Sequence, residues 1–146
     1  MSKSVSIDIS FDKEISVVHV IKTLKKAGWK LTDPEGKSMF LPLGDDGLFD
    51  WQIEVIKERT LLSLIKKKER NHENTGIIMY FESGLMNPVG ISILMFSPQK
   101  ILCSLGIYRR VIEGTTLTDF NWYVSRLIPI LSSSRYIVSF KCEEVF

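Results

Sequence analysis

The sequence lacks the features by which membrane, secreted and disulfide-stapled proteins are recognised. It has only two cysteines, Cys103 and Cys142, and they are too far apart to form a C-x-x-C pair. Both lie in strand-like runs, so we expect buried, reduced thiols that serve as small apolar residues. The opening run MSKSVSIDIS has no apolar stretch of the signal-peptide kind, and no segment approaches the ~20 apolar residues that span a bilayer. We therefore expect a cytoplasmic protein that does not enter a membrane.

Low-complexity runs and internal repeats are also missing. With 45% hydrophobic and 25% charged residues, the composition is that of an ordinary globular protein rather than a disordered one. A chain of 146 residues fits a single domain, and a domain of this size buries roughly 68–70% of its unfolded-chain surface. We therefore predict one domain over residues 1–146 that needs no disulfide or metal to hold its core.

A complete catalytic or metal-binding constellation is missing as well. His19 lies opposite the apolar stripe of a predicted helix, near lysines, and His72 lies in the polar run ERNHEN. We expect both histidines on the solvated surface. Ser104, Ser125 and Cys103 have no histidine placed to activate them, and no G-x-S-x-G signature occurs. The sequence therefore indicates neither an enzyme nor a bound cofactor.

The order of the predicted elements is typical of an α+β fold, with a mainly antiparallel sheet of about six strands and three helices packed against it. Residues 4–11 alternate strictly between polar and apolar side chains, which predicts a half-buried strand. Residues 76–82 leave neither face polar, which predicts a central strand covered on both sides. Further strands are predicted over 37–43, 90–96, 101–112 and 135–144, and 51–56 is either another strand or the start of the second helix.

Capping residues predict where the helices begin and end. Asp12 is expected to cap a first helix that runs to about Ala27, with Gly28 in the left-handed conformation that ends many helices. The run TLTD, residues 116–119, has the spacing of a capping box and is expected to open the third helix, which should end or kink before Pro129. The second helix is indicated by helical spacing at Leu61, Leu64, Ile65 and Lys68.

Charge is unevenly distributed along the chain. The net charge is +2, yet residues 32–58 carry seven acidic residues against two lysines, a balance of −5 that leaves +7 for the rest. A near-neutral total can therefore conceal an acidic face, which matters to a partner more than the sum does. The acidic residues of this segment are Asp33, Glu35, Asp45, Asp46, Asp50, Glu54 and Glu58.

Within that segment, the run GDDGLFDW at residues 44–51 combines Asp45, Asp46 and Asp50 with Phe49 and Trp51. A calcium loop is disfavoured because the adjacent aspartates break the alternation of oxygen ligands that an EF-hand needs. A catalytic pair of Asp46 and Asp50 would need a cleft and environments that separate two pKa values, which the sequence does not indicate. Two interpretations remain: a surface that contacts a protein, or a turn whose aspartates bond their own backbone while Phe49 and Trp51 fold into the core.

Basic residues gather on the second predicted helix, in the run IKKKERN at residues 65–71. Nearby glutamates offset part of the charge, and the helix has an apolar face to bury, so a solvated face is the simpler interpretation. The functional alternative is a nucleic-acid-binding module, which would show affinity that falls steeply with salt. Its candidate contacts are Lys66, Lys67, Arg70 and Arg109.

Trp122 is placed unusually on the third predicted helix. It projects nearly opposite the apolar face formed by residues such as Phe120, Tyr123 and Leu127, on the same side as Arg126. A tryptophan that faces water would be a candidate anchor for a partner, because tryptophan is enriched at interface hot spots. The alternative is that a neighbouring loop covers the indole, as is usual for tryptophan.

Several runs resemble a family of bacterial immunity proteins that accompany polymorphic toxins, including those of contact-dependent growth inhibition. The runs are AGWKLTDPEG, LPLGDDGLFDW, GIYRR, EGTTLTDFNWYVSRLIPIL and SRYIVSFKCEE, so the likeness extends over most of the chain. The resemblance implies a non-enzymatic protein that binds a cognate toxin domain, often a nuclease, and protects the producing cell. One departure is the charge, since immunity proteins for nucleases are commonly strongly negative and this chain is +2.

The resemblance gives the acidic and aromatic residues a role. Asp45, Asp46 and Asp50 are expected to pair with basic residues of the toxin domain, while Phe49 and Trp122 supply apolar anchors. The partner is therefore expected to be a protein, with nucleic acid on the basic helix as the alternative.

Overall fold

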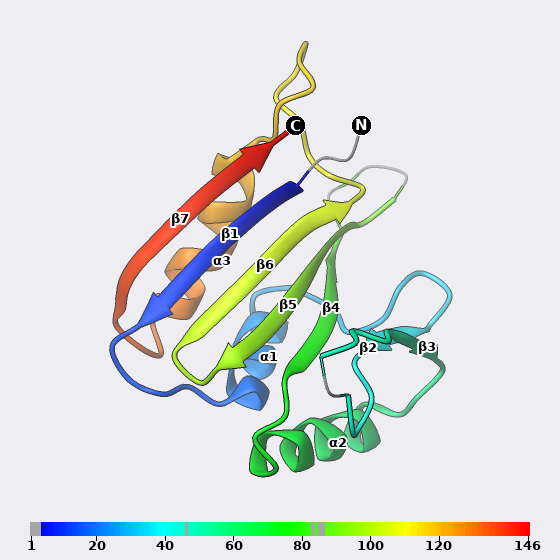
Figure 1. The fold of residues 1–146 in the computed structure, drawn as a ribbon. Coiled ribbons are helices and arrows are strands. Elements are labelled where there is room, and N and C mark those ends of the chain that lie inside the picture. Colours follow the sequence, from blue (N-terminus) through cyan, green and yellow to red (C-terminus); the bar gives the residue numbers. More distant parts are fainter. Residues whose placement is uncertain (1–3, 46, 83, 85–86) are drawn as a thin grey trace.

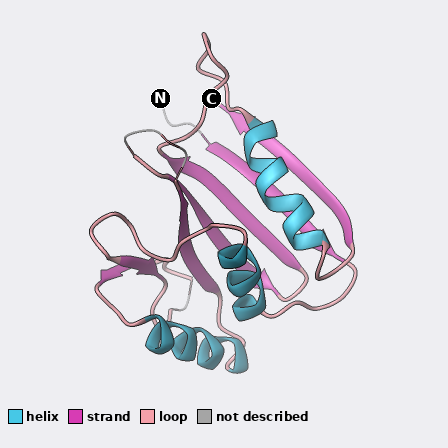
Figure 2. Ribbon diagram, turned by 180° about the vertical axis from the view of Figure 1, so that it is seen from behind, coloured by secondary structure: helices cyan, strands magenta, loops and turns pink. Residues whose placement is uncertain are grey.

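The computed structural model describes residues 4–45, 47–82, 84 and 87–146, and over these it has three helices and a seven-stranded antiparallel sheet (Figure 1). This confirms the predicted α+β class, with one strand more than the six expected. The strand order is β3-β2-β4-β5-β6-β1-β7. Helices α1 and α3 lie across one face of the sheet, and α2 lies beside α1 near β2 and β3 (Figure 2). The other face of the sheet, called the open face below, carries no helix in the described part of the chain (Figure 1).

The strands are β1 (Ser4–Phe11), β2 (Ser38–Phe40), β3 (Gln52–Glu54), β4 (Thr75–Phe81), β5 (Val89–Ser97), β6 (Lys100–Ile107) and β7 (Ile137–Val145), and the helices are α1 (Val17–Lys26), α2 (Glu58–Arg70) and α3 (Phe120–Ser132). The segment 51–56 therefore contains a strand and does not begin the second helix. No helix of the described residues has the length and apolar character needed to cross a membrane.

The core lies between the sheet and the helices. The apolar residues of β1 all point into it, as their alternation predicts, and Ile7 and Ile9 are fully buried. Strand β4 is buried on both sides, also as predicted, because Ile77 and Met79 face the helices while Ile78 faces the open side and is still covered. The helices contribute buried apolar residues such as Leu24, Leu61 and Leu127.

Helix α1 begins later than its predicted cap. Asp12 is not the cap; the helix starts at Val17, after Ser16. The intervening segment is tied to the β5–β6 turn, because the Ile15 N–H donates to the Pro98 carbonyl, 2.8 Å away. At the far end, Gly28 has φ +108°, the left-handed conformation predicted for it.

Helix α3 also begins later than predicted, and the expected capping box at residues 116–119 does not form. Asp119 is the cap, and its carboxylate accepts the Trp122 N–H at 3.3 Å, while the Thr118 hydroxyl is engaged by Glu144. The helix does not end before Pro129 but continues to Ser132. Leu131 is buried beyond the proline, so packing holds this turn helical despite the lost backbone donor.

Strand β6 is shorter than predicted and ends at Ile107 instead of near residue 112. Tyr108 has φ +45°, which turns the chain out of the strand. Arg109 and Arg110 therefore lie in the protruding connection that leads to α3, where Val111 and Thr118 form an isolated bridge (Figure 1).

Trp122 is a core residue, so the interpretation of a water-facing anchor is wrong and the alternative of a covered indole is confirmed. The side chain is 7% exposed and makes edge contacts with the rings of Trp29 and Phe81. The Arg126 guanidinium lies 4.3 Å from the ring centroid and covers the remaining face. The loop after α1, which carries Trp29, thus supplies the cover that the alternative interpretation required.

The open face is partly covered by the connection between β2 and β3. A side chain at Gly76 of β4 would bring its Cβ within 2.8 Å of the Trp51 ring and 2.9 Å of Leu41, so only glycine lets these two residues pack on the strand. This contact explains why Ile78, on the same face, is buried.

We predict that Gly76→Ala destabilises the protein by about 1–2 kcal/mol, because the added methyl group displaces Trp51 and Leu41 from the strand. Gly106→Ala is the matched control, since a Cβ there meets no atom within 4 Å. Chemical denaturation of both variants measures the difference. Equal stability of the two variants would show that the connection does not pack on the open face.

Candidate functional site

The candidate site is the connection between β2 and β3, residues 41–51, which contains the run GDDGLFDW. The two strands pair antiparallel, with Phe40 opposite Gln52, so the connection is the loop of a hairpin. Its start is fixed to the sheet by a hydrogen bond from the Leu41 N–H to the Gly76 carbonyl at 3.0 Å. The loop therefore leaves the sheet at a defined place.

A buried lysine anchors the first half of the loop. Lys68 of α2 is 0% exposed, and its Nζ donates to the Pro42 carbonyl at 2.5 Å and to Glu73 Oε1 at 3.3 Å. The same Glu73 oxygen accepts the Gly44 N–H at 2.7 Å. Lys68 follows Leu61 and Ile65 on the buried face of α2, as its spacing predicts. The end of α2 and the start of the loop are thus tied through one ion pair.

The electrostatics of Glu73 agree with this role. Burial raises the pKa of its carboxyl, but hydrogen bonds from Gly44, Lys68 and Asn71, together with the Lys68 charge, outweigh burial and hold the pKa below its usual value. The carboxylate therefore stays ionised at neutral pH and balances the buried ammonium.

Asp45 forms a hydrogen bond within the loop. It is buried, and its Oδ1 accepts the Phe49 N–H at 3.2 Å. This hydrogen bond supports Phe49 in the left-handed conformation, with φ +55°. The structure therefore confirms, for Asp45, the interpretation of an aspartate that bonds its own backbone, and Asp45 is not exposed for a partner.

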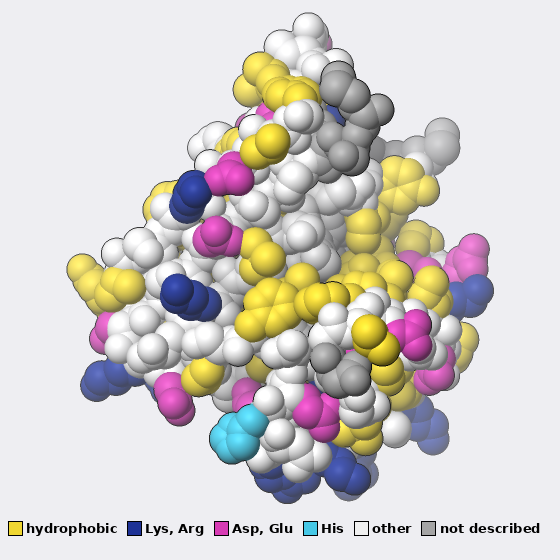
Figure 3. Space-filling view, in the orientation of Figure 1, with side chains coloured by type: hydrophobic (Ala, Val, Ile, Leu, Met, Phe, Trp, Pro, Cys, Tyr) yellow, Lys and Arg dark blue, Asp and Glu magenta, His cyan; other side chains and the backbone are white. Residues whose placement is uncertain are grey.

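Phe49 projects onto the open face of the sheet. Its ring meets Phe96 of β5 edge to face, with ring centroids 5.7 Å apart and an interplanar angle of 84°. The pair is not buried, since Phe49 is 41% and Phe96 50% exposed. Hydrophobic side chains form a band across this part of the open face (Figure 3).

Further exposed residues extend this pair along the hairpin. Leu48 is 81% exposed, Ile53 is also exposed, and the exposed carboxylates Asp50 and Glu54 lie next to them in the chain. We call the set Leu48, Phe49, Asp50, Ile53 and Phe96 the hairpin surface. Glu54 is not part of it, because it lies opposite Ser38 in the strand pair and so projects toward the helix-covered side. The hairpin surface combines an aromatic pair, two aliphatic side chains and one acid.

The predicted site residues are therefore only partly brought together. Phe49 and Asp50 lie on the hairpin surface, Asp45 is buried beneath it, and Asp46 falls outside the described residues. Trp122 packs on the opposite side of the sheet, among the helices. Sequence reasoning missed Phe96, although the alternation of β5 puts it on the opposite side from the buried Ile91 and Ile93.

Several acids of the segment 32–58 interact with groups of the protein itself, so the balance of −5 overstates the negative charge that is free for a partner. Asp33 accepts the N–H groups of Glu35 and Lys37 within a turn, and Glu35 pairs with Lys37. Glu58 forms an ion pair with Lys25 of α1.

The basic residues proposed for nucleic acid are divided as well. Arg109 donates to the Thr118 hydroxyl at 2.8 Å and to the Thr116 carbonyl at 3.1 Å. Lys68, which belongs to the same basic run, is buried. The remaining cations of the second helix, Lys66, Lys67 and Arg70, are exposed on α2.

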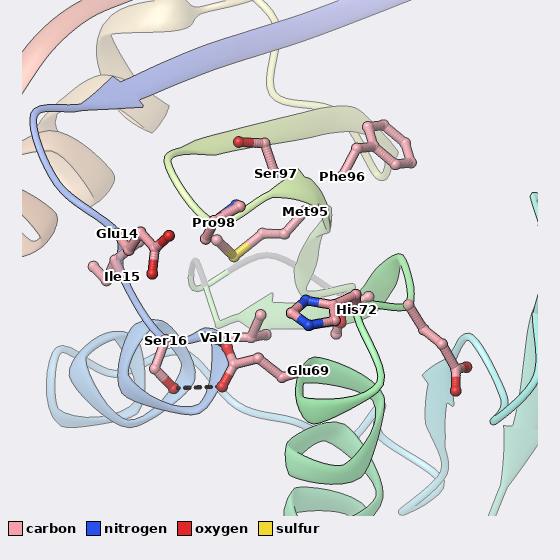
Figure 4. Close-up of a pocket in the computed structure, with 12 residues that line it drawn as sticks. Glu14, Ile15, Ser16, Val17, Glu69, His72, Met95, Phe96, Ser97 and Pro98 are labelled. Carbon is pink, nitrogen blue, oxygen red and sulfur yellow. Dashed lines mark hydrogen bonds between the residues drawn. The ribbon is translucent and has the colours of Figure 1, made fainter.

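A hollow of about 580 Å³ lies beside the hairpin surface, between the start of α1, the end of α2 and the end of β5 (Figure 4). His72 points into it and is exposed, as predicted, and His19 is exposed on α1. Glu69, which also lines the hollow, caps α1 by accepting the Val17 N–H at 2.7 Å and the Ser16 hydroxyl at 3.2 Å. Among the residues that the structure describes, no group of three or more His, Cys, Asp or Glu side chains could hold a metal ion.

The two cysteines differ. Burial, reinforced by the charge of Asp8, raises the pKa of the Cys103 thiol to about 12, so this thiol behaves as the small apolar residue that was predicted. Cys142 is only partly buried, and burial raises its pKa by less.

Comparison with known proteins adds no relative: no family model, no curated protein and no solved structure matches this chain.

We predict that Glu73→Gln lowers the free energy of unfolding by about 2–3 kcal/mol, because it leaves the buried Lys68 ammonium without a counter-charge. The double variant Lys68→Met/Glu73→Gln should recover most of this loss, since methionine suits the buried face of α2. Glu82→Gln is a control that breaks an exposed ion pair with Lys30 and should change stability little. Urea denaturation measures all three, and a stable Glu73→Gln single variant would contradict the anchoring role of the pair.

Proposed function

We propose that this protein neutralises a toxin domain by direct protein–protein contact through the hairpin surface, as a bacterial immunity protein does. The observation that carries the proposal is the solvent-exposed Phe49–Phe96 pair beside Asp50. Exposed apolar patches bordered by polar residues are typical of protein interaction sites. The protein acts on its partner by occupying it, without catalysis, in the cytoplasm of the producing cell.

The support for tight binding is the rigidity of the surface. The Asp45 carboxylate accepts the backbone N–H of Phe49, and the Phe96 ring packs edge to face against the Phe49 ring. The loop that carries it is tied to α2 through Lys68 and Glu73. Because these contacts already hold Phe49 in place, less conformational entropy is lost when a partner binds, and aromatic side chains of this kind are common at the centres of interfaces.

The support for a basic partner region is the charge beside the aromatic pair. Asp50 is exposed on the hairpin, and Asp46 adds a second acid in the sequence. Acids at the border of an interface mainly steer encounter and select the partner. A local acidic surface of this size is compatible with a net charge of +2, so the whole protein need not be acidic.

The nucleic-acid alternative has less support. One of its four candidate cations, Arg109, is already engaged, since it donates to Thr118 and Thr116. Lys68, in the same basic run, is also taken up by its pair with Glu73. Phosphate binding would then depend on the exposed cations of α2, residues 66–70.

The test begins with the gene immediately upstream, where the proposal expects a large secreted protein with a variable C-terminal domain. That C-terminal domain, once purified, is the binding partner in the measurement. We predict that Phe96→Ala raises the Kd for this domain about 30-fold or more at every salt concentration, because it removes a hot-spot contact. Asp46→Ala/Asp50→Ala should weaken binding at low salt and flatten its salt dependence. Isothermal titration calorimetry over a salt series separates the two effects.

The matched control is Leu117→Ala, which removes an exposed apolar side chain from the protruding connection before α3. It should bind like the parent protein. Unchanged affinity of both the Phe96→Ala and the Asp46→Ala/Asp50→Ala variants would place the interface elsewhere. Binding to DNA or RNA that falls with salt and is lost in Lys66→Ala/Lys67→Ala would favour the alternative.

A further inference from the structure

Strand β7 forms the edge of the sheet farthest from the hairpin surface. It is the last strand in the order, after β1, and runs along the free side of the sheet (Figure 1). The strand has nine residues and carries exposed apolar side chains, including Val138 and Phe140. Long edge strands with apolar side chains can add another strand, because one row of their backbone groups has no neighbouring strand.

The hydrogen bonds of β1 show which residues of β7 point their backbone outward. The Phe11 N–H donates toward β6, to the Gln99 carbonyl, whereas the Asp12 N–H donates toward β7, to the Tyr136 carbonyl. Successive residues of a strand direct their backbone N–H and C=O groups to opposite sides, so the even-numbered residues of β1 form their hydrogen bonds with β7. Asp8 lies opposite Lys141, so the backbone groups of Lys141 are used by β1 and those of its neighbours Phe140 and Cys142 face the free edge.

The charges on β7 are self-complementary. Lys141 and Glu143 project from the same face and form an ion pair within the strand, with 2.8 Å between Nζ and Oε2. Cys142 lies between them. An antiparallel pair of β7 strands related by a two-fold axis through Cys142 would place Lys141 of each copy opposite Glu143 of the other. Centring the pair one residue to either side instead would put Lys141 opposite Lys141, or Glu143 opposite Glu143.

We propose that β7 pairs antiparallel with β7 of a second copy about this axis, so that two sheets join into one. Opposite charges face each other in directly opposed positions, which stabilises strand pairing, whereas like charges there oppose it. Lysine on an edge usually prevents strand addition. Here an added strand avoids repulsion only if it places a carboxylate opposite Lys141 and an ammonium opposite Glu143. A second copy of β7 does both, with its own Glu143 and Lys141.

The sheet itself limits the length of this pairing. The register between β1 and β7 shifts between Ser10 and Phe11, so that Ser139 and Ile137 face consecutive residues of β1 and Val138 is extra. The regular part of β7 is therefore 139–145, which is centred on Cys142. Phe140, on the same face as Cys142, would lose part of its exposure in the dimer. The hairpin surface lies at the other edge of each sheet and stays accessible in both copies, so the proposal is independent of the proposed function.

The test is sedimentation equilibrium of the full chain over a concentration series up to about 1 mM. We predict a monomer–dimer equilibrium for the parent protein. Lys141→Glu and Glu143→Lys should each raise the dimer Kd about tenfold or more, because each replaces two opposite-charge contacts by two like-charge contacts. The charge-swapped double variant Lys141→Glu/Glu143→Lys should restore the parent Kd.

Lys66→Glu is the matched control, since it makes the same charge change on the exposed face of α2 and should leave the Kd unchanged. Circular dichroism confirms that each variant is folded. A parent protein that remains monomeric at every concentration would overturn the proposal. Single variants that dimerise like the parent protein, or a double variant that fails to recover, would overturn the two-fold pairing through Cys142.

Discussion

The buried ammonium of Lys68 is the interaction on which the candidate site depends. A lysine with no exposed surface is tolerated only where its charge is matched and its donors are used, and here Glu73 and the Pro42 carbonyl meet both needs. Because Glu73 also accepts the Gly44 N–H, one ion pair closes the end of α2 onto the start of the β2–β3 loop. This anchor fixes the start of the loop at Pro42 and Gly44.

The two faces of the sheet have different roles. The helix-covered face holds the fold, with Trp122 and Trp29 packed against the strands. On the open face, Gly76 leaves room for Leu41 and Trp51, and the loop then turns so that Phe49 meets Phe96 in solvent. This exposed aromatic pair is the feature that supports the proposal of a protein partner.

Much of the fold follows from the sequence, because local periodicity dictates it: the alternation of β1, the left-handed Gly28 and the buried spacing of Lys68 all agree with the structure. The site follows less well, since it depends on contacts between distant segments. A helical projection places Trp122 opposite the apolar stripe, but it cannot show that the loop after α1 covers that side. The pairing of Phe49 with Phe96 joins residues 47 positions apart and has no local signal.

Hydrogen exchange with mass spectrometry, on the protein alone and bound to the toxin domain, tests the central claim most directly. Amides that a partner covers exchange more slowly, so the contact surface is read without any substitution. We predict slower exchange on binding over residues 47–55 and over the end of β5, residues 94–97, with no change in α3. Protection confined to the basic end of α2, or to α3, would contradict the assignment of the hairpin surface as the binding site.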